Sequence, residues 1–196
     1  EGSTEATRVV ASLLSDLVER GLDADRMRLW VIDGGKALRK AIVQTFGQRA
    51  LIQRCQEHKR RNVLEHLPED AHASVKRALK DAWSASDTDL ARKQLARLAS
   101  SLQAKHPGAA ASVREGLDET LTVQALGITG SLYRTLRTTN PIENLNSSVA
   151  RYCRNVGVVN EERLKLQAVG AHEHVQEGLR RTSKGLGAAG YRWLVM

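Results

Sequence analysis

The 196-residue sequence contains little cysteine and few aromatic residues, and it has no long apolar run. Two cysteines, Cys55 and Cys153, are too few for a disulfide framework, which favours a reducing cytosol. There is no stretch of about 18 apolar residues and no signal peptide, so we expect a cytoplasmic protein with no membrane partner. Aromatic residues make up 4%, so the core must be mainly Leu, Val, Ala and Ile. The first residue is Glu1 rather than Met, which predicts that the sequence is part of a longer protein.

Basic residues outnumber acidic residues, with 30 Lys and Arg against 22 Asp and Glu and a net charge of +8. Such a balance describes partners rather than fold, and it favours polyanions, with nucleic acid first. Charge alone does not separate a nucleic-acid-binding protein from one that is simply basic.

Two short apolar segments alternate with helical stripes near the start of the chain. Residues 27–32 (MRLWVI) and 49–55 (RALIQRC) have strand composition, and helical stripes cover residues 9–18 and 38–46. The order helix, strand, helix, strand predicts a parallel sheet with crossover helices. Two strands are too few for a stable sheet, so we expect further strands before residue 1. An all-helical protein is the alternative.

Beyond residue 57 the strand signals vanish and helical stripes recur. Asp87 is a candidate N-cap, and Pro141 has the position of a first helical residue. A last amphipathic helix is predicted over residues 161–181, followed by a loose Gly- and Ala-rich tail over 184–190. The predicted fold class is therefore α/β, predominantly helical.

Two acidic residues stand where a carboxylate could do chemistry. Asp33 follows the first strand at a Gly-Gly turn, and ligands of parallel sheets bind outside the carboxyl ends of strands. Glu143 lies in the first turn of the helix that begins at Asn140-Pro141, where it could ligate a hard cation. Each has a purely structural alternative: Asp33 as an N-cap, and Glu143 as the acid of a capping box.

Cys55 and His58 have the CxxH spacing of half a zinc site. A tetrahedral site needs a second pair of ligands, and no matching pair follows. We therefore interpret Cys55 as a buried thiol at a strand end and His58 as a residue at a helix start.

Basic residues cluster around the same segments. The common fate of such runs is a solvated helix face, but cations beside carboxylates also suit phosphodiester chemistry on DNA. The candidate DNA-binding residues are Lys36, Arg39, Lys59, Arg60, Arg61, Arg137, Arg151 and Arg154.

These motifs combine into a resemblance that covers nearly the whole chain. The segment VIDGGKALRKAIVQTFGQRALIQRCQEHKRRNVLEHLP, followed by LRTTNPIENLNSSVARYCRNV, resembles the Mutator family of insertion-sequence transposases. Three features occur in order at family-like spacing: the strand-end Asp33, the QxCxxH pattern of Gln53, Cys55 and His58, and the TTNPIEN segment that carries Glu143.

The resemblance implies a partial ribonuclease-H-like core interrupted by a helical insertion. It implies core residues 1–56, a helical insertion over 57–130, and the rest of the core with the tail over 131–196. Asp33 and Glu143 match the second Asp and the final Glu of an acidic triad that would hold two Mg²⁺ or Mn²⁺ ions about 3.5–4 Å apart. The implied site-supporting residues are Cys55, His58, Asn140 and Asn144.

The implied activity is metal-dependent cleavage and strand transfer of transposon-end and target DNA by a nucleoid-associated homo-oligomer. The family's first catalytic Asp lies upstream of this segment, and GVVNEERLKLQAV lacks expected tryptophans, so we predict that the chain alone does not transpose. A catalytically inactive DNA-binding or dimerising remnant is the main alternative. A third possibility is a small helical nucleic-acid-binding protein, which predicts that Asp33 and Glu143 lie far apart.

Overall fold

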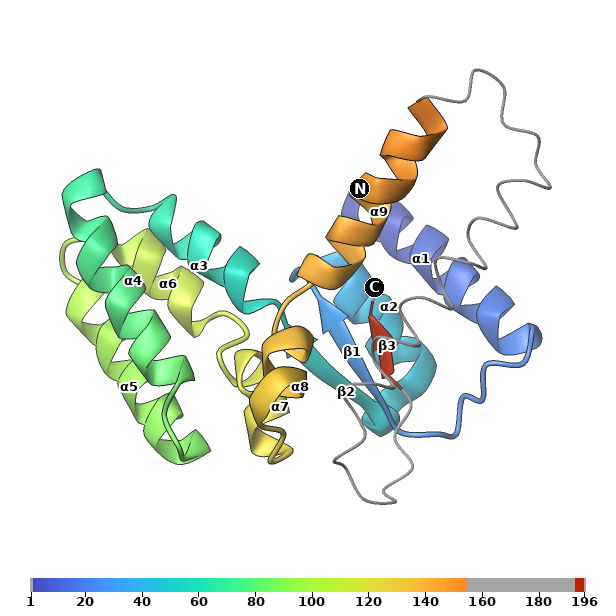
Figure 1. The fold of residues 1–196 in the computed structure, drawn as a ribbon, viewed down its shortest axis with the longest axis horizontal. Coiled ribbons are helices and arrows are strands. Elements are labelled where there is room, and N and C mark those ends of the chain that lie inside the picture. Colours follow the sequence, from blue (N-terminus) through green and yellow to red (C-terminus); the bar gives the residue numbers. More distant parts are fainter. Residues whose placement is uncertain (1, 155–192, 196) are drawn as a thin grey trace.

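The computed structural model describes residues 2–154 and 193–195, and this part of the chain is mostly helical around a small parallel sheet (Figure 1). The elements are, in order, α1 (Gly2–Glu19), β1 (Arg28–Ile32), α2 (Lys36–Phe46), η1 (Gly47–Arg49), β2 (Ala50–Arg54), α3 (Gln56–Leu64), α4 (Glu69–Trp83), α5 (Thr88–Leu102), α6 (Pro107–Arg114), η2 (Asp118–Thr120), α7 (Thr122–Ala125), α8 (Gly130–Leu136), α9 (Asn140–Arg154) and β3 (Trp193–Val195). The helix predicted over 161–181 and the tail over 184–190 lie outside the described residues.

The sheet confirms both predicted strands and excludes the all-helical alternative. In the described residues its strand order is β2-β1-β3, with β1 parallel to both neighbours. The third strand, β3, comes from the apolar end of the chain, where the sequence predicted no strand. Whether further strands precede residue 1 stays a prediction.

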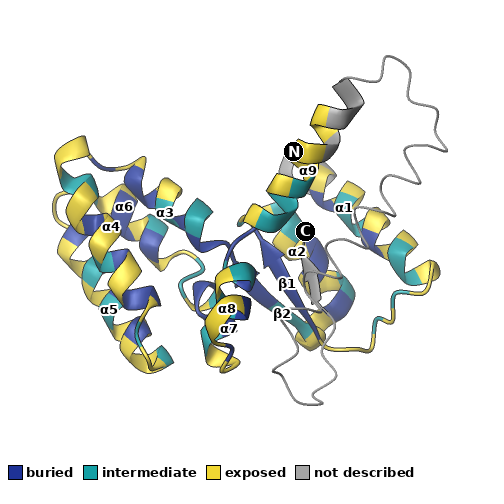
Figure 2. Cartoon of the chain, in the orientation of Figure 1, coloured by how far each residue is buried: buried dark blue, intermediate teal, exposed yellow. Residues whose placement is uncertain are grey.

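Helices pack against both faces of β1. Alternate side chains of a strand point to opposite faces, so each face contributes its own set of buried residues. Trp30 and Ile32 pack with Leu14, Ile42 and Phe46 of α1 and α2. The ring centroids of Trp30 and Phe46 are 4.8 Å apart. The other face, with Leu29 and Val31, packs against residues of α7 and α8 and the loop between them, namely Val123, Ile128, Leu132 and Leu136. β1 is therefore buried along its whole length (Figure 2), as expected for a parallel strand covered on both faces.

A separate apolar cluster lies among α3, α4, α5 and α6, to one side of the sheet in Figure 1. Its fully or nearly fully buried members include Val63, Leu79, Ala91, Leu95 and Ala109. In the described part of the chain, no helix combines the length and apolar character needed to cross a bilayer.

The buried side-chain amides of Gln53 and Gln56 join the helical segment that begins with α3 to the sheet. The Gln53 side chain is fully buried; its Nε2 donates to the Thr120 carbonyl at 3.0 Å and its Oε1 accepts from the Val123 amide at 2.9 Å. Gln56 Nε2 donates to the same Thr120 carbonyl at 2.9 Å. The Trp83 indole donates to Thr120 Oγ1 at 3.2 Å. The end of β2 is thus held against η2 and the start of α7.

Asp87 is the N-cap of α5, as predicted from the sequence. Its Oδ2 accepts from the Leu90 amide at 3.0 Å, which satisfies one of the free N–H groups of the first turn. We expect Asp87→Ala to lower the free energy of unfolding by about 1 kcal/mol and Asp87→Asn by only a few tenths. Urea denaturation of the two variants measures this difference, and equal stability of both would contradict the capping role.

Candidate active site

Asp33 lies at the carboxyl end of β1, and its side chain is exposed. Its Oδ1 accepts from the Gly35 amide at 2.8 Å, which closes a tight turn through Gly34. The N-cap of α2 is Gly35, and no side chain caps the helix, so the interpretation of Asp33 as an N-cap is wrong. Asp33 therefore directly follows the carboxyl end of β1, the position where parallel α/β proteins bind ligands.

Glu143 lies in the first turn of α9. Its carboxylate Oε1 accepts a hydrogen bond from the Thr139 hydroxyl and lies 3.8 Å from His58 Nδ1. The Thr139 carbonyl accepts from the Glu143 amide at 3.1 Å. The helix begins at Asn140 itself, one residue before the start that the predicted capping box requires. Thr139 therefore orients both the backbone and the carboxylate of Glu143.

The CxxH pair lies directly beside Thr139. Cys55 is fully buried and precedes α3, while His58 lies in the first turn of that helix, so both sequence interpretations are confirmed. Cys55 Sγ is 3.2 Å from His58 Nδ1, accepts from the Thr139 amide at 3.4 Å, and lies 3.4 Å from the Thr139 hydroxyl oxygen. Among the described residues no group of three or more His, Cys, Asp or Glu is arranged to hold a metal ion.

A chain of contacts links Glu143 to the strand that carries Asp33. Glu143 binds Thr139, Thr139 binds Cys55, and the Cys55 amide donates to the Ile32 carbonyl at 2.7 Å. Ile32 is the residue before Asp33. Figure 1 shows α9 beginning at the end of the sheet where β1 ends. The fold therefore brings both acidic segments to the same end of the sheet, where the carboxyl end of β1 lies.

Asn140 and Asn144, predicted to support the site, are both exposed near the start of α9. The Asn144 carbonyl accepts from Ser148 Oγ at 2.9 Å. Their supporting role stays a prediction.

The predicted DNA-binding residues differ in their availability. Lys36, Arg61 and Arg151 are exposed. Arg39 pairs with Glu119 at 2.5 Å between its Nε and the carboxylate. The Arg154 side chain lies outside the described residues.

Two further members of the predicted set are held by local partners. Arg60 forms an ion pair with Glu57 one turn earlier in α3. Arg137 is half-buried; its guanidinium lies 5.8 Å from the centre of the Tyr133 ring and donates to Gln56 Oε1 at 3.5 Å.

Lys59 does not fit the predicted DNA-binding set, because its side chain is only 3% exposed. Its ammonium donates to the carbonyls of Ser112 and Glu115, at 2.7 and 2.5 Å, and lies 3.6 Å from the Glu115 carboxylate. Arg54 makes the matching contacts from the end of β2, with Nη1 donating to the Glu115 carbonyl at 3.0 Å. The role of Lys59 is to hold α3 against the end of α6.

Burial and, to a lesser extent, the nearby Arg54 charge lower the pKa of Lys59, while Glu115 and Glu119 raise it, and the net pKa is about 8. Burial also raises the pKa of Glu115, but Arg54 and Lys59 outweigh it and the net pKa is lowered. The unfolded chain keeps a lysine pKa near its ordinary value, so between these two pKa values it binds more protons than the folded chain.

The free energy of unfolding should therefore rise with pH above about 8 and fall as pH drops through the folded pKa of Lys59. Between pH 7.5 and 9.5 we expect the wild type to gain about 2 kcal/mol relative to Lys59→Met. Urea denaturation at several pH values measures this gain. The exposed Lys76→Met is the matched control and should keep the wild-type slope.

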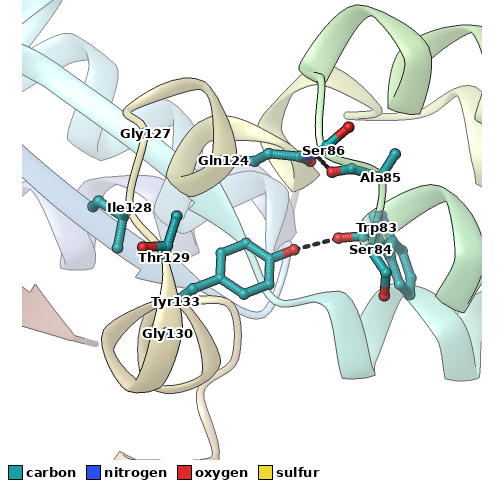
Figure 3. A pocket seen from close by; sticks show the side chains of 10 residues that line it. All are labelled: Trp83, Ser84, Ala85, Ser86, Gln124, Gly127, Ile128, Thr129, Gly130 and Tyr133. Carbon is teal, nitrogen blue, oxygen red and sulfur yellow. Dashed lines mark hydrogen bonds between the residues drawn. The ribbon is translucent and has the colours of Figure 1, made fainter.

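A surface pocket lies between the end of α4 and the α7–α8 turn (Figure 3). The Tyr133 hydroxyl donates to the Trp83 carbonyl at 2.7 Å, and Gln124 Nε2 donates to the Ala85 carbonyl (Figure 3). No acidic or basic side chain lines this pocket, so its walls offer no charged ligand for a divalent ion or a phosphate. It is not part of the candidate active site.

Sequence reasoning missed the roles of three residues around the site: Thr139, Arg54 and Glu115. Thr139 was visible only as part of the TTNPIEN segment. The one local signal for the role of Arg54 is its place at the end of an apolar strand. A charge that is buried there needs a partner, so the position indicates an ion pair. That partner, Glu115, lies 61 residues away in sequence.

A family model and several curated relatives of this chain all point to one family of proteins. The model of the family described as "Transposase, Mutator family" matches residues 2–176. The transposase for insertion sequence element IS6120 of Mycolicibacterium smegmatis is 34% identical over 76% of this chain and 45% of its own length. For the IST2 transposase of Acidithiobacillus ferrooxidans the identity is 30%, over 76% and 49% of the two chains.

The transposase for IS256 in transposon Tn4001 of Staphylococcus aureus is 33% identical over 76% of this chain and 37% of its own length. The chain thus spans less than half the length of each of these relatives. The match of the family model, which covers most of the sequence, shows that the chain belongs to the Mutator family of transposases.

Proposed function

We propose that this chain is the later part of a DDE transposase catalytic core, in which Asp33 and Glu143 hold divalent metal ions for DNA cleavage and strand transfer. The observation that carries the proposal is the contact chain from Glu143 through Thr139 and Cys55 to Ile32, which brings the Glu143 helix to the edge where Asp33 emerges. The proposed division is a ribonuclease-H-like core over 1–56 and 131–196 with a helical insertion over 57–130. The separate apolar core of α3 to α6 supports this division.

The donor chemistry suits Mg²⁺ or Mn²⁺. Mg²⁺ takes oxygen ligands and uses one or two protein carboxylates together with substrate phosphate oxygens. Asp33 is exposed, and Glu143 keeps 43% of its side chain accessible. Bound ions would supply Lewis-acid polarisation of the phosphate and a lowered pKa of a coordinated water. A third carboxylate, the first Asp of the triad, would come from outside this chain.

The chain's own residues would orient these ligands and bind DNA. The Thr139 hydroxyl fixes one Glu143 oxygen, with His58 and Cys55 behind it. The exposed cations Lys36, Arg61 and Arg151 would neutralise phosphates of transposon ends and target DNA. We place the whole protein in the cytoplasm at the nucleoid, as a homo-oligomer when complete.

A nicking assay on transposon-end DNA, with and without Mg²⁺, tests this function in the whole protein. We expect metal-dependent strand cleavage by the wild type and its loss in Asp33→Ala. Cleavage that persists in Asp33→Ala would refute the assignment.

A second candidate is an inactive DNA-binding or dimerising remnant, which the net charge of +8 would also suit. This candidate predicts that the chain never cleaves DNA but binds it with an affinity that falls steeply as salt rises. Binding measured between about 50 and 200 mM salt, beside the nicking assay, separates the two candidates.

A further inference from the structure

Arg54 connects three segments that are far apart in sequence. It ends β2, and its side chain is 6% exposed. Its Nη2 donates to the Gly34 carbonyl at 2.7 Å, and its Nη1 donates to the Glu115 carbonyl at 3.0 Å. Its Nη1 also lies 3.4 Å from a carboxylate oxygen of Glu115. The guanidinium therefore lies between the turn that carries Asp33 and the end of α6.

The two backbone segments approach Arg54 so closely that a Cβ on either glycine would have to displace the guanidinium. A Cβ at Gly34 would lie 2.5 Å from Arg54 Nε, and a Cβ at Gly116 would lie 2.5 Å from Nη1. Both glycines also have positive φ angles, 109° and 62°. Each flank of the guanidinium is thus packed against a glycine backbone, with hydrogen bonds to carbonyls on both sides.

We propose that Arg54 is a positioning residue for Asp33, and that it ties the Asp33 turn to the Glu115–Gly116 end of the helical segment. The planar guanidinium has donors in a rigid fork, which suits two carbonyls in different directions. Gly34 lies between Asp33 and Gly35, whose amide binds Asp33 Oδ1, so fixing the Gly34 carbonyl fixes the whole turn. Lys59 holds the Glu115 carbonyl from the other element, α3. The metal-binding consequence of this positioning rests on the proposed function of Asp33.

Hydrogen exchange of the Gly35 amide tests the positioning without any metal. In the ¹⁵N-labelled 196-residue chain, we expect Arg54→Lys to raise the Gly35 exchange rate at least tenfold, because lysine cannot bind both carbonyls in the same geometry. Arg77→Lys, on the exposed face of α4, is the matched control and should leave the rate within twofold. An unchanged Gly35 rate in a folded Arg54→Lys chain would overturn the proposal.

A pair of glycine variants covers the case in which Arg54→Lys does not fold. Gly34→Ala forces a Cβ against Arg54, whereas Gly21→Ala imposes a similar positive φ, 104°, with nothing within 4 Å of the new Cβ. Displacement of the Arg54 Nε resonance in Gly34→Ala, and not in Gly21→Ala, supports the contact. An equal effect in both would overturn it.

Mn²⁺ binding then separates this proposal from the function on which it rests. Paramagnetic broadening of the Gly34 and Gly35 amide resonances should appear as Mn²⁺ is added and should be lost in Asp33→Asn. In Gly34→Ala the Mn²⁺ concentration for half broadening of Gly35 should rise at least tenfold, and in Gly21→Ala less than twofold. No broadening in the wild type would refute Asp33 as a metal ligand, while the exchange rates alone would still decide the role of Arg54. Equal broadening in Gly34→Ala and wild type would refute the effect on metal binding.

Discussion

Replacing Glu143 by glutamine is expected to lower metal-dependent DNA cleavage by the whole protein about a thousandfold. Glutamine keeps the shape of the side chain and can still accept from the Thr139 hydroxyl, so the α9 start should stay intact. It removes the negative charge needed to hold a divalent ion. Metal polarisation contributes several kcal/mol to such reactions, and each 1.36 kcal/mol is a factor of ten in rate.

The control for this loss is Glu69→Gln, which also removes an acid from the first turn of a helix, but on α4. Cleavage rates, DNA affinity and thermal unfolding should be measured for both variants. We expect Glu69→Gln to cleave like the wild type, and Glu143→Gln to bind DNA within about twofold of it, because each exposed cation contributes separately to phosphate binding. Cleavage by Glu143→Gln at the wild-type rate would exclude Glu143 as a metal ligand.

Local signals in the sequence were sufficient for several elements. The apolar composition of residues 27–32 and 49–55 predicted the two strands, which the structure places at 28–32 and 50–54, and the abrupt change at Asp33-Gly34 predicted where β1 ends. Asp87 as an N-cap follows from one residue type in front of a helical stripe. These features depend on neighbours within a few residues, so periodicity and capping chemistry are enough to find them.

Long-range pairing could not be predicted in the same way. β3 is three residues long and pairs with a strand more than 160 positions earlier, so its short apolar run had no local pattern to separate it from a loose tail. Lys59 sits in the basic run KRR and its composition suggested a solvated or DNA-facing side chain. Its partners, Ser112 and Glu115, lie more than 50 residues away, and only the packing of α3 on α6 reveals that it is buried.

The same long-range packing predicts a large stability effect at Gln53. Gln53→Leu keeps a similar volume but removes its bonds to the Thr120 and Arg54 carbonyls, at 3.0 and 2.7 Å, and its bond from the Val123 amide. Val123 is 1% exposed, so its amide is left without water or another partner. An unsatisfied buried group costs about 1–3 kcal/mol, and each lost hydrogen bond costs about 1 more. We expect the free energy of unfolding to fall by about 3–4 kcal/mol.

Urea denaturation followed by circular dichroism measures this loss, with the exposed Gln44→Leu of α2 as the matched control, expected within about 0.5 kcal/mol of wild type. Wild-type stability of Gln53→Leu would mean that the junction between β2 and α7 contributes little. A domain typically has only about 5–15 kcal/mol of stability, so the expected loss is a large share of the total.

The QxCxxH pattern then has two physical parts: Gln53 joins the helical segment to the sheet, while Cys55 and His58 face Thr139 and Glu143. One short segment therefore fixes both the position of the helices and the orientation of a candidate metal ligand.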